Sequence, residues 1–302
     1  CFSTPEDLIN NLNNIQHTLE NEFQGLFADR LVSFKRKIAA FGFHFASLDI
    51  RQDSRMLSGA FDHVLACNTD VLPSNFTELE EAEQINALLS ISSEIDVEKL
   101  SDSIAIDTLD SLRTMREIQE SNGERACNRY IISNCRGPLD IARLIALFRL
   151  SGWSLEKLTV DIVPLFETIE DLKHAGRNMS VLYELPNYRE HLVRRGDKQT
   201  IMLGFSDGTK DGGYLMANWA IYAAKESLTE VSRSNKIEVC FFDGRGGPPA
   251  RGGGSTYKFY AALGKSLESN QIQLTVQGQT ISSYYGTKIG ATHNLRQLLA
   301  AG

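Results

Sequence analysis

The stretch "QTIMLGFSDGTKDGGYLMANWAIYAAKESLTEVSRSNKIEVCFFDG", Gln199 to Gly244, decides the fold. It opens with an apolar strand, continues through a helical segment and closes with a second apolar strand. Both strands are apolar without interruption, which is typical of parallel strands that are buried on both faces. The stretch therefore predicts one strand–helix unit of a parallel sheet and the strand that follows it.

The same alternation recurs on both sides of this stretch. Further strands are predicted at "RYIISNC", "LTVDIVPLFET" and "QIQLTVQGQ", and helices at "GPLDIARLIALFRLSG" and "IEDLKHAGRNMSVLYEL". With "FGFHFASLDI" read as an earlier strand, the chain has about six strands, whereas a closed (β/α)8 barrel needs eight. We expect a helix-rich α/β fold that forms part of a TIM-type barrel, with an open parallel sheet as the alternative.

The pattern divides the chain into four segments. We expect N-terminal helices over 1–40, the first barrel strand within 41–53, and a helical insertion over 54–126. Successive strand–helix units of the incomplete barrel are expected over 127–302.

Composition excludes several classes of protein. The chain has 302 residues, 42% of them hydrophobic, and a net charge of −7. This acidic balance argues against a general nucleic-acid or anionic-membrane binder, and no apolar run approaches the ~20 residues of a membrane span. The 5 cysteines are scattered without metal-binding spacing, which predicts reduced thiols and a cytoplasmic location.

Polar residues gather where the predicted strands end, as they do in barrel enzymes. Glu167 and Asp207 each follow an apolar strand, so together they suit a hard divalent cation. The alternative for Asp207 is capping of the next helix. Lys210 stands near a helix start, where it could serve an anion or be merely solvated. Arg51 could bind a phosphate or pair with a neighbouring aspartate.

A second cation pair lies in the glycine-rich stretch "CFFDGRGGPPARGGG", Cys240 to Gly254. Exposed backbone N–H groups in such a loop can cradle an anion, and its prolines stiffen the centre. We expect Arg245 to be a fixed anion ligand and Arg251 to lie on a part that moves. The glycines expected to give the loop its mobility are Gly244, Gly246, Gly247, Gly252 and Gly253.

In this order, six segments resemble phosphoenolpyruvate carboxylases. They are "LDIRQDS", "YIISNCRGPLD", "PLFETIEDL", "MLGFSDGTKDGGYLMANW", "FFDGRGGPPARGGG" and "LTVQGQTISSYYG". The resemblance implies a barrel of the phosphoenolpyruvate/pyruvate superfamily. It also implies carboxylation of phosphoenolpyruvate by bicarbonate to oxaloacetate and phosphate, with Mg²⁺ or Mn²⁺ as cofactor.

The resemblance also assigns roles to residues. It implies that Glu167 and Asp207 bind the metal, and that Arg51 and Arg245 bind the substrate phosphate. Lys210 would lie beside the bicarbonate, and Arg251 would act from the mobile loop. Leu165 and Met202 would line an apolar pocket for CO₂.

The chain departs from the family pattern in ways that bear on function. Asp243 stands where histidine is more frequent, and we expect it to point away from the site or to pair with an arginine. Val276 and Gln279 replace glutamates, so no catalytic role is assigned there. Family members are much longer and usually tetrameric, so we expect no carboxylase activity from these residues alone. The alternatives are another lyase or phosphotransferase on a similar barrel, or an anion-binding fragment without turnover.

Overall fold

The computed structural model describes residues 4–246, 254–264, 266–268, 270–276 and 278–301. The chain forms two compact units. The smaller unit consists of residues 1–49 and 113–128, and the larger unit of residues 50–112 and 129–302. Residues 54–112 therefore belong to the same unit as the sheet. The four segments suggested by the sequence stay a prediction.

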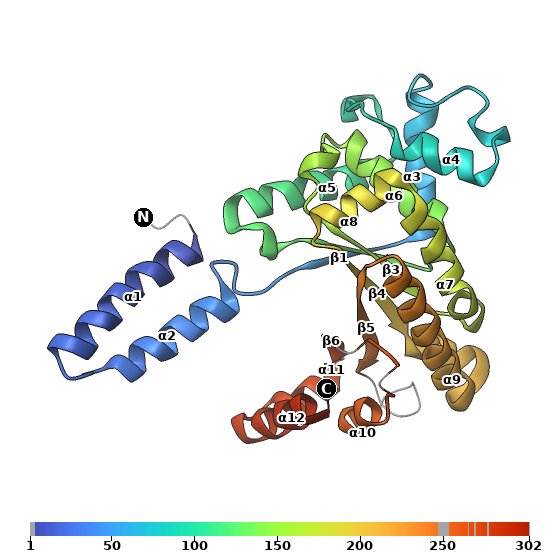
Figure 1. Cartoon of the computed structure of the whole chain (residues 1–302). Coiled ribbons are helices and arrows are strands. Elements are labelled where there is room, and N and C mark those ends of the chain that lie inside the picture. Colours follow the sequence, from blue (N-terminus) through green and yellow to red (C-terminus); the bar gives the residue numbers. More distant parts are fainter. Residues whose placement is uncertain (1–3, 247–253, 265, 269, 277, 302) are drawn as a thin grey trace. The chain divides into compact units, whose positions relative to one another are not determined.

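The smaller unit is built on an antiparallel helical hairpin, α1 (Pro5–Glu22) and α2 (Ala28–Phe41) (Figure 1). Thr4 caps α1 and Asp7 completes a capping box, with Pro5 in the first turn. Leu12 and Ile38 are the buried residues of the two helices, which pack against each other. α1 follows directly from these local start signals and from the helical spacing of its apolar residues, whereas α2 has no side-chain cap.

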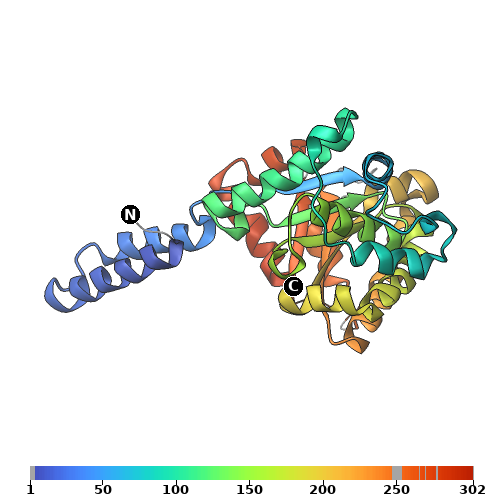
Figure 2. The ribbon, with the colours of Figure 1, turned by 90° about the horizontal axis from the view of Figure 1, so that it is seen from above.

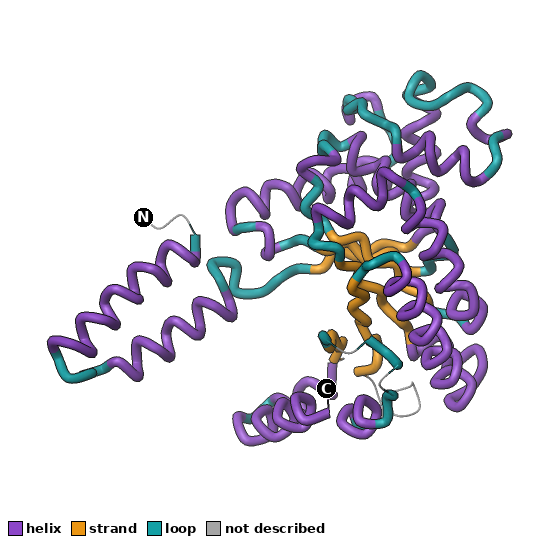
Figure 3. The backbone as a smooth tube through the Cα atoms, viewed as in Figure 1, coloured by secondary structure: helices purple, strands orange, loops and turns teal. Residues whose placement is uncertain are grey.

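The larger unit is built on a six-stranded sheet in the order β1-β2-β3-β4-β5-β6. Strands β2 to β6 pair in parallel, and helices follow the strands around the curled sheet (Figures 2 and 3). The strands are β1 (Asp49–Asp53), β2 (Arg129–Ser133), β3 (Asp161–Phe166), β4 (Lys198–Gly204), β5 (Glu238–Gly246) and β6 (Ile272–Val276).

Helices connect the strands, and the central residues of β2 and β3 are buried. The long connecting helices are α6 (Pro138–Leu150), α7 (Ile169–Glu184) and α9 (Phe205–Ser234). α7 packs closely against α9, where a Cβ on Gly176 would lie 2.1 Å from the Ser227 hydroxyl. The helix-rich α/β class and the parallel pairing predicted from the apolar runs are thereby confirmed.

The described residues form further α-helices (Figure 1). They are α3 (Ser54–Cys67), α4 (Glu81–Leu89), α5 (Ser103–Asn122), α8 (Pro186–Arg194), α10 (Thr256–Ala261), α11 (Gly278–Tyr285) and α12 (Lys288–Ala301). Within the part of the chain that the structure describes, no helix is both long enough and apolar enough to cross a membrane.

The first strand lies later in the chain than the sequence suggests. Residues 42–46 form turns and bends, residues 47–48 have no regular structure, and only Asp49–Asp53 is a strand. Gly42 and Phe45 have φ values of 53° and 61°, which a strand does not allow. The aromatic side chains of Phe43 and Phe45 are exposed and do not enter the sheet. The prediction of a strand over "FGFHFASLDI" was therefore wrong except at its end.

Candidate active site

The carboxyl ends of β1 and β3 meet through an ion pair. The Arg51 guanidinium on β1 lies 3.2 Å from Glu167 Oε1, directly after β3. The sequence suggested a neighbouring aspartate as the alternative partner of Arg51. Asp53 binds Arg55 instead, at 2.9 Å. Glu167 is only 13% exposed whereas Arg51 is 48% exposed, so the arginine is the partner with room to move.

The second oxygen of Glu167 is held by the connection after β2. The Asn134 backbone N–H donates to Glu167 Oε2 at 2.9 Å. Asn134 has a φ of 55°, and its side-chain amide donates to Asp53. The Ser54 hydroxyl donates to the Asn134 carbonyl at 2.7 Å. Glu167 is therefore held by groups from the ends of β1 and β2. Nothing in the sequence marked Asn134 beyond its place after a strand.

Glycine on the neighbouring strand makes room for Glu167. A Cβ on Gly204, the last residue of β4, would lie 3.1 Å from Glu167 Cγ and 3.2 Å from its Cα. Real Cβ atoms rarely approach other atoms so closely, so a larger residue at this position would push Glu167 out of place.

Burial is the main cause that raises the pKa of Glu167. The Asn134 N–H and the Arg51 charge oppose this shift, while the charges of Asp207 and Asp171 add to it. The influence of Asp207 means that the two predicted metal ligands lie close enough for their charges to interact. A site that holds two carboxylates near each other, one of them largely buried, fits a divalent cation that would neutralise both.

Asp207 and Lys210 both lie in the first turns of α9. The Lys210 ammonium lies 2.5 Å from Asp207 Oδ1, and both side chains are largely exposed. Gly204 is the N-cap residue of α9, so Asp207 is a first-turn acid and not the cap. Asp211 accepts a hydrogen bond from the Ile169 N–H, which ties the starts of α9 and α7 together.

Leu165 and Met202 lie side by side, as register partners on β3 and β4. Both are buried in one apolar cluster that also contains Ile131, Val163 and Phe242. The structure thus brings the two predicted apolar residues together, in a cluster that also includes residues of β2 and β5.

Arg245 points toward aromatic rings. Its guanidinium lies 4.1 Å from the centroid of Phe259 and 5.4 Å from that of Phe205, and the residue is buried. Gly244 and Gly246 lie in β5, where they pair with Gly204 and Val276, so they belong to the strand and not to the loop. The predicted loop residues Gly247, Arg251, Gly252 and Gly253 lie outside the described residues.

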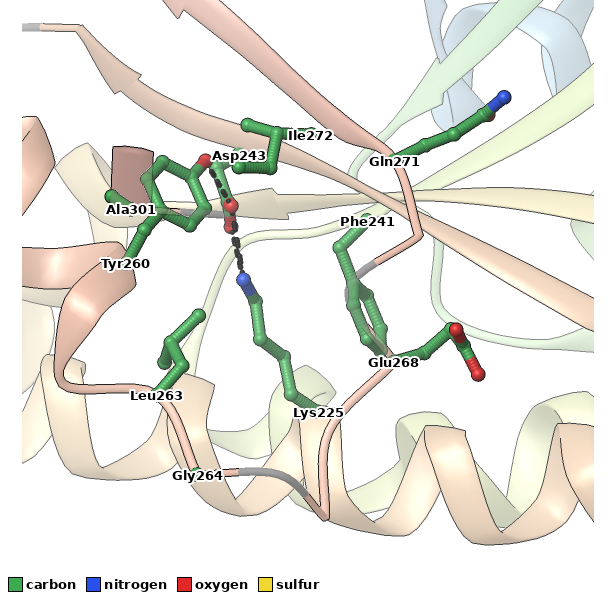
Figure 4. Close-up of a pocket in the computed structure, with 10 residues that line it drawn as sticks. All are labelled: Lys225, Phe241, Asp243, Tyr260, Leu263, Gly264, Glu268, Gln271, Ile272 and Ala301. Carbon is green, nitrogen blue, oxygen red and sulfur yellow. Dashed lines mark hydrogen bonds and ion pairs between the residues drawn. The ribbon is translucent and has the colours of Figure 1, made fainter. Parts of the chain in front are cut away.

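Asp243 pairs with a lysine, whereas we expected it to point away from the site or to pair with an arginine. Lys225 of α9 lies 2.9 Å from its carboxylate, and the Tyr260 hydroxyl donates to it at 2.6 Å (Figure 4). Lys225 and Asp243 are 2% and 1% exposed, beside a cavity of about 120 Å³. The Lys225 charge offsets that of the aspartate, so an anion two residues before Arg245 is tolerated. Burial, and then Asp243, raises the pKa of Tyr260, which stays a donor.

Comparison with known proteins identifies the family. The family model described as phosphoenolpyruvate carboxylase matches residues 1–302. The chain belongs to the phosphoenolpyruvate carboxylase family. It is 35% identical to the phosphoenolpyruvate carboxylase of Corynebacterium diphtheriae, over 99% of this chain and 34% of the relative. The relatives from Nitrosomonas eutropha and Synechococcus sp. are 36% and 33% identical, over 31% and 28% of their lengths.

The chain therefore spans about a third of the length of the curated phosphoenolpyruvate carboxylases that it matches. Family membership rests on the whole chain, since between 95% and 99% of it is aligned in these comparisons. The part that it covers includes the Arg51, Glu167 and Asp207 positions at the strand ends.

Proposed function

We propose that this chain supplies part of the active site for carboxylation of phosphoenolpyruvate by bicarbonate, which yields oxaloacetate and phosphate. The observation that carries the proposal is the convergence of Arg51, Glu167 and Asp207 at the carboxyl ends of β1, β3 and β4. The sheet would then be part of a (β/α)8 barrel of the phosphoenolpyruvate/pyruvate superfamily, whose sites are built at these strand ends.

Glu167 and Asp207 would hold Mg²⁺ or Mn²⁺. Among the described residues, no cluster of three or more histidine, cysteine or acidic side chains is suited to a metal ion. Two carboxylates leave the other positions to water and substrate oxygens, as Mg²⁺ prefers. When bound, the metal would supply positive charge that stabilises the enolate oxygen.

The cationic side chains would position the phosphate. In the first step, a bicarbonate oxygen bonds to phosphorus while the bond from phosphorus to the enol oxygen breaks. Such a transfer depends on cations placed around the phosphoryl oxygens more than on a nucleophilic side chain. Arg51 would leave Glu167 to bind these oxygens. Arg245 would act from the end of β5 and Arg251 from the glycine loop, and Lys210 would hold the bicarbonate.

The first step would yield carboxyphosphate and an enolate, and the apolar cluster would protect the enolate from water. Carboxyphosphate then splits into CO₂ and phosphate, and the enolate carbon attacks CO₂ to form the new carbon–carbon bond. Leu165 and Met202 would exclude water from this space, because water would protonate the enolate.

We further propose that the whole protein acts in the cytoplasm as a homotetramer. The four cysteines of the described residues, all of them free thiols, support the cytoplasmic location.

Metal binding can be measured on this chain alone. We expect Mn²⁺ to bind at one site in calorimetry, and Glu167→Gln or Asp207→Asn to weaken it at least about 10-fold. Glu170→Gln is the matched control, because Glu170 is exposed on α7 and pairs with Lys173 and His174. Unchanged Mn²⁺ affinity in Glu167→Gln would remove Glu167 from the metal site.

The reaction itself can be tested in a chimera. These 302 residues would replace the matching third of the Corynebacterium diphtheriae relative, and oxaloacetate would be measured with a coupled dehydrogenase. We expect turnover that requires phosphoenolpyruvate, bicarbonate and Mg²⁺, and a loss of about 100-fold or more in kcat for Glu167→Gln. A folded chimera without turnover contradicts the proposal.

A further inference from the structure

A separate hollow lies between the start of α6 and the outer face of α7. It has a volume of about 510 Å³ and is lined by Arg136, Arg143, His174, Arg177 and Asn178, among others. Its size lies in the range of small-molecule sites, which is about 300–1,000 Å³. We call this hollow the arginine pocket. It shares none of its lining residues with the site proposed above.

Two guanidinium groups of the arginine pocket are unengaged. The side chains of Arg136 and Arg177 form no hydrogen bond or ion pair with any residue of the described ranges, and both residues are exposed. Arg143 is partly buried, and its Nε has no hydrogen-bond partner. Three arginines facing one hollow are a local exception in a chain whose net charge is −7.

The acidic groups at the arginine pocket do not cancel this charge. Asp140 lies 3.5 Å from Arg143 and accepts a hydrogen bond from the Arg136 backbone N–H at 2.9 Å. Its charge is thus offset within the protein. Glu81, at the start of α4, is exposed at the rim. Two positive side chains and the imidazole of His174 remain to face a ligand.

The backbone that carries Arg136 is held in place. Its N–H donates to Asp140, and its carbonyl accepts from the Asn178 side chain at 3.0 Å. The next residue, Gly137, is the N-cap of α6 and offers no side chain to cap the helix. The first turn of α6 therefore adds its positive dipole end to the guanidinium groups.

We propose that the arginine pocket binds a small molecule that carries phosphate groups, at a site separate from the proposed catalytic one. Guanidinium groups bind phosphate oxygens through two parallel hydrogen bonds each, which distinguishes phosphate from simple anions. Two unengaged guanidiniums, one just before α6 and one on α7, suit a diphosphate better than a single phosphate. The proposal does not depend on the reaction proposed for the chain.

Inorganic pyrophosphate is the probe, used with the whole chain in a buffer that contains EDTA and 150 mM NaCl. At this salt concentration, general attraction between exposed charges is screened beyond about 8 Å. We expect calorimetry to show binding that the double variant Arg136→Ala/Arg177→Ala weakens at least about 10-fold. Both side chains are exposed, so the variant should keep its circular dichroism spectrum and its melting temperature.

Two control variants decide where pyrophosphate binds. Arg36→Ala removes an exposed arginine of α2 and should leave the affinity unchanged. Arg51→Gln removes a cation of the proposed catalytic site and should also leave it unchanged. If Arg51→Gln abolishes binding while the double variant retains it, the anion site is the catalytic one and the proposal is wrong. Absence of pyrophosphate binding to the unchanged chain likewise overturns it.

Discussion

Asp243 shows how one buried charge depends on its neighbours. Lys225 lies between this carboxylate and the rings of Phe241, Phe259 and Tyr260, at 5.1–5.8 Å from their centroids. The carboxylate and the ammonium are both removed from water, so each needs the other and the tyrosine hydroxyl to offset the cost of desolvation. The pair joins β5 to α9, and Tyr260 joins both to α10.

Removing one partner of this pair should be costly. We expect Lys225→Met to lower the free energy of unfolding by about 3–5 kcal/mol, because it leaves the Asp243 charge buried without a counter-ion. The double variant Lys225→Met/Asp243→Asn should lose less than the sum of the two single changes. Urea unfolding followed by circular dichroism gives these values. A loss below about 1 kcal/mol for Lys225→Met would contradict the burial of a charged pair.

His191 predicts a dependence of stability on pH. Burial, followed by the charges of Arg195 and Arg194, lowers its pKa from 6.5 to about 3. Below pH 6.5 the unfolded chain therefore gains a proton that the folded chain does not bind, so stability falls as the pH decreases. The contribution of His191 to the free energy of unfolding is therefore about 2 kcal/mol less favourable at pH 5 than at pH 7.5, because each pKa unit corresponds to 1.36 kcal/mol.

His191→Leu should remove this part of the pH dependence. Urea unfolding at pH 5 and pH 7.5 measures the difference, and His174→Gln is the control because His174 is exposed on α7. An equal pH dependence in His191→Leu and the unchanged chain would show that the buried imidazole is not responsible.

At the scale of elements, α9 contains a kink that its glycines explain. Gly213 has φ 77° and ψ 169° inside the helix, a conformation that is essentially restricted to glycine. Phe205 to Gly212 form the part before the kink, which carries Asp207 and Lys210. The helix begins at Phe205, directly after β4. The kink thus separates the polar first turns from the long apolar remainder.

Gly213→Ala should destabilise the chain by about 1–3 kcal/mol, because alanine pays a steric penalty at this φ and ψ. A Cβ there meets no atom within 4 Å, so the loss would be conformational and not a clash. Gly59→Ala is the matched control inside α3, also without a neighbour within 4 Å, and should stabilise by about 0.5–1 kcal/mol. Thermal unfolding that ranks the two variants in the opposite order would contradict the kink.

At the scale of the whole molecule, the chain divides into two units that each pack within themselves. The 2 tryptophans of the chain, Trp153 and Trp219, both belong to the larger unit. Trp153 is buried, and its indole N–H donates to the Leu112 carbonyl at 2.9 Å. Tryptophan fluorescence therefore reports on the folding of the larger unit alone.

Deletion of residues 1–45 should leave the larger unit folded. We expect the urea transition measured by tryptophan fluorescence to keep its midpoint, because the α1–α2 hairpin buries its own residues Leu12 and Ile38. The unchanged chain measured in parallel is the reference. A deletion variant whose fluorescence transition becomes broad, or moves to lower urea, would show that the hairpin supports the sheet.

The elements of the larger unit could largely be predicted from the sequence. Five of the six strands follow apolar runs, and the capping residues before α7 mark where it begins. β1 could not be predicted in this way, because Asp49–Asp53 is polar and only its neighbours in the sheet make it extended. The family motifs pointed to Glu167, Asp207, Leu165 and Met202, but neither Asn134 nor Gly204 carried a signal.

The sequence by itself determined the order of strands and helices and the family, because both depend on local patterns along the chain. Only the tertiary structure decided the partners of the charged residues. Arg51 pairs with Glu167 across 116 positions, and Asp243 with Lys225 across 18, each in preference to closer candidates. The physical reason is that strand register and the curl of the sheet bring these side chains together, and no local pattern records which strand ends will meet.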